Sequence, residues 1–250
     1  MAQARRPSSI VRFDIIDSTN DEARRRAEAG EPGPLWLLAA RQTAGRGRRG
    51  HTWLSPPGNL HLTGLFTLAA PPAQAALLSY AAAVAAAQAL EMFGATDLRL
   101  KWPNDVWAGD AKLAGVLLES GLGPAGRWLA VGIGANLAEA PEIAGRRTIS
   151  LAALTVRAAP APDDVAAVLA ERFEHWLERF KATGFAEIRA AWLARAFGRG
   201  EMIEAQAPAG AVVGRFETLD EAGALIVIDT AGVRHAVTAG EVFFPPPAKE

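Results

Sequence analysis

The chain of 250 residues contains no cysteine, which excludes disulfide bonds, thiolate metal sites and cysteine nucleophiles. Net charge is nearly absent as well: the formal value is -1 at pH 7, so no overall field attracts the protein to nucleic acid or to an anionic membrane. Lysine is scarce, since four of the 26 basic residues are lysines and the others are arginines. Any positively charged site must therefore be local.

The sequence also lacks an export signal and a clear membrane span. Its start, MAQARRPSSIVRFDII, has paired arginines but no apolar segment behind them. The longest apolar run, residues 75–90, is rich in alanine, includes Ser79, Tyr80 and Gln88, and falls short of a membrane span. Because 50% of the residues are hydrophobic and 21% are charged, the composition is that of a globular protein, which we expect in the cytoplasm.

Strand and helix patterns alternate over the first 200 residues and predict an α/β (α+β) domain with a mixed sheet. Strands are expected near residues 10–16, 35–42, 59–68, 98–102, 112–120 and 128–137, with a turn-rich connection over 103–111, and helices near 19–29, 72–93, 162–183 and 185–196. After residue 200 the chain changes to short strand-like runs separated by glycines, which is typical of a small β barrel. Two domains are therefore predicted, 1–200 and 201–250.

The segment QTAGRGRRGHTW, residues 42–53, places three arginines among glycines. It lacks the lysine and hydroxyl residue of a phosphate-binding P-loop, and Pro56 and Pro57 exclude the helix that a dinucleotide fold needs there. Glycines allow the backbone to approach a ligand closely, and arginine side chains bind carboxylate or phosphate through two parallel hydrogen bonds. Taken alone, the segment fits either an anion-binding loop or a solvated basic turn.

The segment KWPNDVWAGDAKLAG, residues 101–115, contains two of the rare lysines, Lys101 and Lys112. An ammonium group at the start of the strand that Lys112 opens could reach a ligand pocket. Asp105 stands in a turn and offers oxygen ligands suited to Mg²⁺. The alternative is a surface hairpin with ordinary turn residues.

Ser18, Thr19 and Asn20 open the first expected helix, and Thr19 and Glu22 have the spacing of a capping box. These residues fit a helix cap, or alternatively three short side chains that hydrogen-bond a neutral polar ligand. The histidines, at positions 51, 61, 175 and 235, are too widely spaced to predict a metal cluster.

The order of the motifs adds a further observation. DSTN, RQTAGRGRRG followed by Trp53, KWPND, KLAG, GIGANL and a small β domain ending near GEVFF follow one another, and from about Ile10 to Phe244 the chain resembles the biotin protein ligases. The resemblance implies a catalytic domain like that of class II aminoacyl-tRNA synthetases, followed by an SH3-like barrel. It also implies that ATP activates biotin to biotinyl-5′-adenylate, with release of pyrophosphate, before transfer to a lysine of a biotin carboxyl carrier protein.

The same resemblance assigns roles to individual residues. Lys112 and Arg48 would be catalytic, Asp105 would bind Mg²⁺, and Trp53 would form a wall of the pocket. The implied biotin-binding residues are Ser18, Thr19, Asn20, Gln42, Arg46, Gly47, Arg48, Lys112 and Gly115, and the implied ATP-binding residues are Arg46, Arg48, Asn104, Lys112 and Asn136.

Some members of this family carry an N-terminal DNA-binding domain and repress genes. Here the catalytic pattern begins near Ile10, so neither a DNA-binding domain nor repression is expected, and no membrane partner is expected. The alternatives are a lipoate protein ligase, a biotin-binding protein without catalysis, and a nucleic-acid-binding protein that uses the arginines near Trp53. The oligomeric state is left open, and a homodimer is compatible with the sequence.

Overall fold

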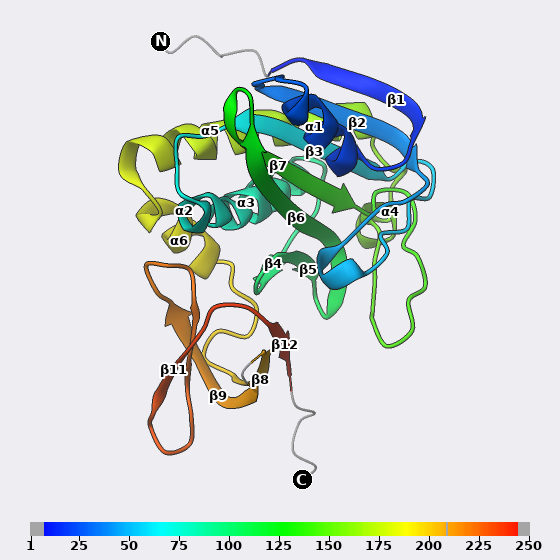
Figure 1. Cartoon of the computed structure of the whole chain (residues 1–250). Helices are drawn as coiled ribbons and strands as arrows, with labels where there is room; N and C mark the ends of the chain where they lie inside the picture. Colours follow the sequence, from blue (N-terminus) through cyan, green and yellow to red (C-terminus); the bar gives the residue numbers. More distant parts are fainter. Residues whose placement is uncertain (1–7, 209, 245–250) are drawn as a thin grey trace, which may run out of the picture.

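The computed structural model describes residues 8–208 and 210–244; the paired arginines at the start of the chain lie outside these ranges. Seven strands form one sheet in the order β1-β2-β3-β7-β6-β5-β4 (Figure 1). β1 and β2 pair in parallel and the other neighbours pair antiparallel, which confirms the expected mixed sheet. The strands are β1 (Ile10–Ile16), β2 (Leu35–Gln42), β3 (Leu60–Thr67), β4 (Leu98–Lys101), β5 (Asp105–Ala108), β6 (Ala111–Gly123) and β7 (Gly126–Ala135).

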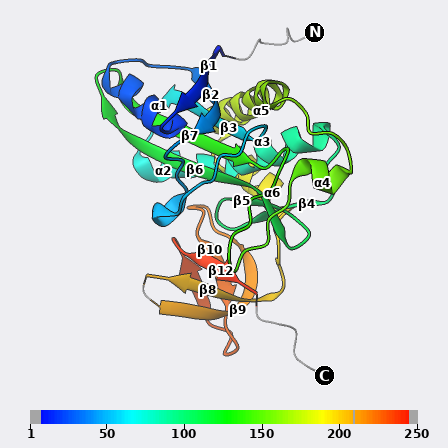
Figure 2. The same cartoon turned by 90° about the vertical axis from the view of Figure 1, so that its right-hand side faces the viewer.

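Helices cover both faces of this sheet (Figures 1 and 2). They are α1 (Thr19–Glu28), α2 (Pro72–Ala76), α3 (Leu78–Met92), α4 (Leu151–Thr155), α5 (Pro162–Thr183) and α6 (Ala186–Leu193). Ala23 and Ala27 of α1 pack with Leu65 in a small core on one face, while Leu62 faces the larger core on the other. Side chains along a strand alternate between faces, so β3 contributes to both layers.

The alanine-rich helix is the centre of the larger core. α2 and α3 together run from Pro72 to Met92, which is long and apolar enough to cross a membrane, contrary to the estimate made from residues 75–90 alone. However, 72% of its most apolar stretch is buried inside the protein, where α3 packs against α5 and the sheet. This burial is typical of a core helix, and small alanine side chains allow the close packing.

The C-terminal segment forms the expected small antiparallel β domain of the SH3-like type. Its strands are β8 (Met202–Ala207), β9 (Gly210–Leu219), β10 (Leu225–Ile228), β11 (Arg234–Val237) and β12 (Glu241–Phe243), in the order β11-β10-β9-β8-β12. Arg189 Nε of α6 donates to the Leu219 carbonyl at 2.7 Å, and the Tyr80 hydroxyl donates to the Gly223 carbonyl at 2.5 Å. These bonds attach the small domain to the larger one; the boundary at residue 200 stays a prediction.

Three local details differ from the sequence expectations. The connection 103–111 contains the short strand β5, and α4 was not expected at all. The cap of α1 is Ser18, whose side chain accepts from the Asp21 amide, so the capping-box assignment to Thr19 was wrong by one residue. The reason is that the Thr19 side chain is buried and is used in a different hydrogen-bond network.

Candidate active site

One pocket is lined by all the residues that the sequence predicted for the site. It lies between the start of α1, the loop 43–53 and strands β3, β6 and β7, and it encloses about 1280 Å³ when its open mouth is included. The residues involved are Ser18, Thr19, Asn20, Gln42, Arg46, Gly47, Arg48, Trp53, Asn104, Asp105, Lys112, Gly115 and Asn136. Positions spread over more than a hundred residues are thereby brought together, although proximity alone does not assign their roles.

The floor of the pocket is a part of the sheet in which glycines of neighbouring strands stand side by side. Gly115 of β6 pairs with Gly134 of β7, and Gly134 pairs with His61 of β3, so these three residues form one row across three strands. A Cβ atom at Gly134 would overlap the indole ring of Trp53, and one at Gly115 would come within 2.9 Å of Lys112 Nζ. Glycine therefore makes room for the side chains that form the walls.

At one end of the pocket, neutral polar side chains bond to each other. The Thr19 amide and hydroxyl donate to Gln42 Oε1 at 2.9 and 3.0 Å. The Thr63 hydroxyl lies 2.7 Å from both Thr19 Oγ1 and Asn20 Oδ1, and Asn20 Nδ2 donates to Glu119 at 2.8 Å. This network fixes the orientation of the buried hydroxyl and amide groups, and it ends on the Glu119 carboxylate, whose charge is paired with Arg46.

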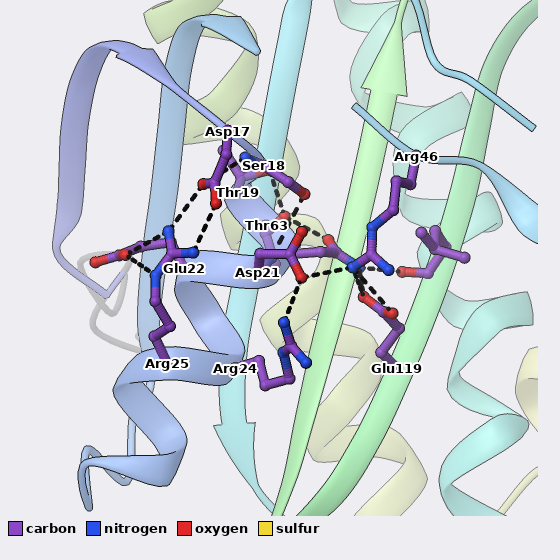
Figure 3. Close-up of polar contacts among 12 residues, drawn as sticks. Asp17, Ser18, Thr19, Asp21, Glu22, Arg24, Arg25, Arg46, Thr63 and Glu119 are labelled. Atoms are coloured by element: carbon purple, nitrogen blue, oxygen red, sulfur yellow. Dashed lines mark hydrogen bonds and ion pairs between the residues drawn. The ribbon is translucent and has the colours of Figure 1, made fainter. Parts of the chain in front are cut away.

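Arg46 is paired with two carboxylates (Figure 3). Its NH2 group lies 2.8 Å from Asp21 Oδ1 and 3.3 Å from Glu119 Oε1. The sequence suggested a cation free to bind biotin or phosphate, whereas here the guanidinium group ties the loop 43–53 to α1 and β6. Because this side chain is 42% exposed, the ion pairs are weakened by solvent.

Arg48, two residues further along, has a different environment. Its NH1 group donates to Asn104 Oδ1 at 3.3 Å, and Asn104 in turn donates to the Val116 carbonyl of β6. Burial lowers the pKa of the Arg48 guanidinium, with a further contribution from Arg49, and the group keeps its charge because arginine titrates far above neutral pH. A partly desolvated cation at this position is suited to bind an anionic ligand.

Lys112 is the second residue of β6, and its backbone is bonded twice to the segment 147–149: its amide donates to the Arg147 carbonyl and its carbonyl accepts from the Ile149 amide. Nζ lies 2.7 Å from Asp105 Oδ1 and 5.6 Å from the centre of the Trp53 ring. Trp53 therefore forms a wall beside the ammonium group, as expected.

Two predicted ligands have partners within the protein. Asn136 uses its Nδ2 group on the Lys112 and Ile149 carbonyls, at 3.4 and 3.3 Å, and so supports the strand that carries the lysine. Asp105 is paired with Lys112, and the described residues contain no group of three His, Cys, Asp or Glu side chains suited to a metal ion. These residues do not build a metal site of their own.

The pocket also contains residues that sequence reasoning did not assign to it. Lys101 lies 4.3 Å from the centre of the Trp107 ring, and burial lowers its pKa while Asp105 and Glu241 oppose the shift. Glu241 comes from the small domain. The rarity of lysine could have indicated Lys101, and the position of His61 between Leu60 and Leu62 could have indicated a polar side chain facing away from the large core.

Comparison with known proteins identifies the family. Residues 13–136 match the Biotin/lipoate A/B protein ligase family, and residues 199–244 match the biotin protein ligase C terminal domain. A biotin–[acetyl-CoA-carboxylase] ligase of Paracoccus denitrificans is 43% identical over 91% of this chain and 97% of its own length. The bifunctional ligase/repressor BirA of Escherichia coli is 35% identical over 74% of this chain and 58% of its own length.

The fold matches solved structures of the same kind. The biotin protein ligase of Aquifex aeolicus in complex with biotin and ATP superposes with a TM-score of 0.80 at 28% identity, over 94% of this chain and 97% of that one. The same family is indicated by the fold, by both matched sequence regions, and by the 43% identity to a ligase over nearly its whole length. This chain therefore belongs to the biotin protein ligase family of enzymes.

Proposed function

We propose that the protein joins biotin to a lysine of a biotin carboxyl carrier protein, with ATP as the energy source. The observation that carries the proposal is the division of the pocket: neutral hydroxyl and amide groups lie at one end, and Arg48, Lys101 and Lys112 bring cationic groups to the same cavity. A ligand with a polar uncharged head and an anionic tail matches both ends. The relatives named biotin ligases support this choice.

In the first step, an oxygen of the biotin carboxylate attacks the α-phosphorus of ATP. The bond from that phosphorus to the bridging oxygen breaks, and the products are biotinyl-5′-adenylate and pyrophosphate. Two anions must approach each other, so nearby cations lower the barrier. Lys112 and Arg48 are the catalytic groups in this proposal, because both lie in the pocket and both are partly withdrawn from solvent.

The head of biotin would lie among the neutral side chains. Ser18, Thr19, Asn20 and Gln42 form this end. Thr19 bonds to Gln42, Asn20 to Thr63 and Ser18 to the Asp21 amide, so the side chains are oriented before a ligand arrives. Gly115 leaves space beside Lys112 for the tail. Gly47 would allow the loop backbone to approach the ligand.

ATP would lie toward the cationic end. Arg48 and Asn104 are already hydrogen-bonded to each other there, and Asn136 supports the Lys112 strand. Arg46 would act mainly by holding the loop over both substrates. Mg²⁺ would enter as part of the substrate MgATP. Asp105, which is paired with Lys112, is the carboxylate that would face the ion.

In the second step, the neutral amine of the acceptor lysine attacks the carbonyl carbon of the mixed anhydride. The bond to the phosphate oxygen breaks, AMP leaves, the amine loses its proton, and an amide remains. No covalent bond to the enzyme is needed, which agrees with a sequence that contains no cysteine. A cytoplasmic location, the absence of DNA and membrane binding, and a homodimer stay predictions.

Lipoate ligation is the main competing activity because the matching family includes lipoate ligases. The test supplies purified protein with MgATP and either biotin, lipoate or octanoate, and measures pyrophosphate release. We expect release with biotin and little with the other acids; faster release with lipoate would overturn the assignment. A carrier domain should then become biotinylated, whereas a carrier domain with its acceptor lysine replaced by arginine should not. Binding of biotin without any pyrophosphate release would indicate a non-catalytic protein.

A further inference from the structure

His61 is a buried histidine whose ring nitrogens have no partner. The residue is 1% exposed, and neither Nδ1 nor Nε2 forms a hydrogen bond of normal geometry with any residue that the structure describes. Burial lowers the pKa of His61 to about 4, opposed by the Pro56 carbonyl, which one ring nitrogen approaches without the alignment of a normal hydrogen bond, so the ring is neutral at physiological pH. Since buried polar groups nearly always have partners, this ring requires an explanation.

The position of His61 provides one. It lines the pocket, in the row of the floor that contains Gly134 and Gly115. Thr63 follows two residues later on the same face of β3 and belongs to the neutral network with Thr19 and Asn20. His61 therefore extends the neutral end of the pocket along the strand.

A second unpartnered group lies beside it. The indole of Trp53 covers Gly134, the residue that pairs with His61, and Trp53 Nε1 is also buried without a partner among the described residues. Trp107, Trp128 and Trp192 also bury an Nε1 group without a partner among the described residues, so it is the histidine in the pocket wall that points to a polar ligand. A neutral histidine offers one donor and one acceptor, and the indole offers one donor.

The neighbours of His61 indicate which part of biotin would meet it. Thr63, two residues away on the same face of β3, bonds to Thr19 and Asn20, among which the head of biotin would lie. Lys112 Nζ, where the carboxylate belongs, lies beside Gly115, on the other side of Gly134 and the Trp53 indole that covers it. His61 is therefore placed to meet the head, whose ureido ring presents a carbonyl oxygen next to an N–H group.

We propose that His61 is a biotin-binding residue, which hydrogen-bonds to the ureido group through its unused ring nitrogens. This inference rests on the proposed function. The thioether sulfur is the other candidate partner, but it is a weak acceptor and cannot use the imidazole acceptor. His61 thereby selects a neutral head that both donates and accepts hydrogen bonds, while Lys112 selects the carboxylate.

Affinity measurements test the contact. His61→Phe keeps an aromatic ring but removes both nitrogens, and we expect it to weaken biotin binding by about tenfold or more in calorimetry. Affinity for ATP should stay unchanged. His61→Gln, which retains a donor and an acceptor, should recover part of the loss, and the exposed His175→Gln is the matched control. Unchanged biotin affinity in folded His61→Phe would overturn the proposal.

Desthiobiotin distinguishes a contact with the ureido group from a contact with the sulfur, because it keeps the ureido group and lacks the sulfur. If His61 binds the ureido group, His61→Phe should weaken both ligands by the same factor. A loss seen with biotin alone would assign His61 to the sulfur and overturn the ureido contact.

A spectroscopic test needs no variant of His61 itself. The chain has four histidines, so imidazole ¹⁵N signals can be assigned by elimination with His51→Gln, His175→Gln and His235→Gln. On adding biotin to the wild-type protein, we expect the His61 nitrogens to shift as new hydrogen bonds form. If biotin binds but these signals stay in place, His61 does not contact it. If biotin does not bind at all, the proposed function itself fails.

Discussion

The floor of the pocket and the loop 43–53 above it are built in different ways. The floor is part of three paired strands, in which Gly115, Gly134 and His61 are held by ladders that continue on both sides. The loop has one isolated bridge, between Arg46 and Thr52, and a single short 3₁₀ turn at Arg48–Gly50. The floor is fixed by ladders to neighbouring strands, whereas beyond Ala44 the loop's backbone hydrogen bonds close on the loop itself, as from the Trp53 amide to the Gly45 carbonyl, and its ties to β6 and α1 are made by the Arg46 side chain.

This difference matches the two tasks of the proposed reaction. Substrate orientation requires a surface that does not move, and a ladder of backbone hydrogen bonds supplies it. Substrate entry and retention of a reactive intermediate require a cover that opens and closes. The exposed ion pairs of Arg46 each contribute about 0–1 kcal/mol, so they can break at little cost.

The largest effect is expected at Lys112, at the start of β6 on the floor side. Lys112→Ala removes the ammonium group at the Trp53 wall, and we expect pyrophosphate release to fall by about a hundredfold or more. The fold should survive because the strand is held through its backbone bonds to Arg147 and Ile149. Lys181→Ala, at an exposed lysine of α5, is the matched control. Near-normal pyrophosphate release by Lys112→Ala would show that this lysine only pairs with Asp105 and does not take part in catalysis.

The next effect belongs to the loop. Arg48→Gly should raise the biotin KM by about thirtyfold, since a charge-assisted contact is lost. Arg48→Lys should not restore the wild-type value, because an ammonium group cannot reproduce two parallel hydrogen bonds. A loop that has lost this contact should also release biotinyl-adenylate to solvent.

Release of the intermediate is measured as biotin incorporation into an unrelated lysine-rich protein. The comparison with wild type is made at equal adenylate formation, so that a slower first step does not disguise the result. Labelling restricted to the proper acceptor in both enzymes would show that Arg48 does not retain the intermediate. The loop would then have no demonstrated role in holding biotinyl-adenylate.

A glycine of the floor tests its rigidity. Gly134→Ala places a methyl group against the Trp53 ring, and we expect biotin affinity to fall by about tenfold as the indole is displaced. Gly121→Ala is the matched control: its Cβ would come within 2.7 Å of the Trp128 ring on the same strand pair, away from the pocket. Both variants should lose stability in thermal melts, while only Gly134→Ala should lose biotin affinity. Equal biotin affinity of the two variants would show that the floor can shift to accommodate the added methyl group.

The sequence predicted the strands of the floor better than it predicted the contacts of the loop. The strands of the floor were found because hydrophobic periodicity specifies strands locally, as in 128–137 for β7. Contacts of side chains that lie far apart in the chain left no such signal: the pairing of Arg46 with Asp21 and Glu119 spans up to 73 positions. The site residues were gathered through family resemblance, and His61 was missed because a single histidine within a strand has no pattern of its own.

The smallest effect is expected at Arg46, the loop's ionic anchor. Arg46→Met keeps an apolar stem but removes the ion pairs with Asp21 and Glu119, and the biotin KM should rise by about twofold to fivefold. Arg24→Met is the matched control, because Arg24 also lies 2.8 Å from Asp21 Oδ1 but is part of α1. Hydrogen exchange of the loop amides should accelerate in Arg46→Met and stay unchanged in Arg24→Met. Since exposed ion pairs are screened by salt, the two variants should converge in biotin KM near 1 M ionic strength, where the screening length is about 3 Å. A difference that persists at high salt would show that Arg46 contacts substrate directly, as the sequence suggested, and does more than anchor the loop.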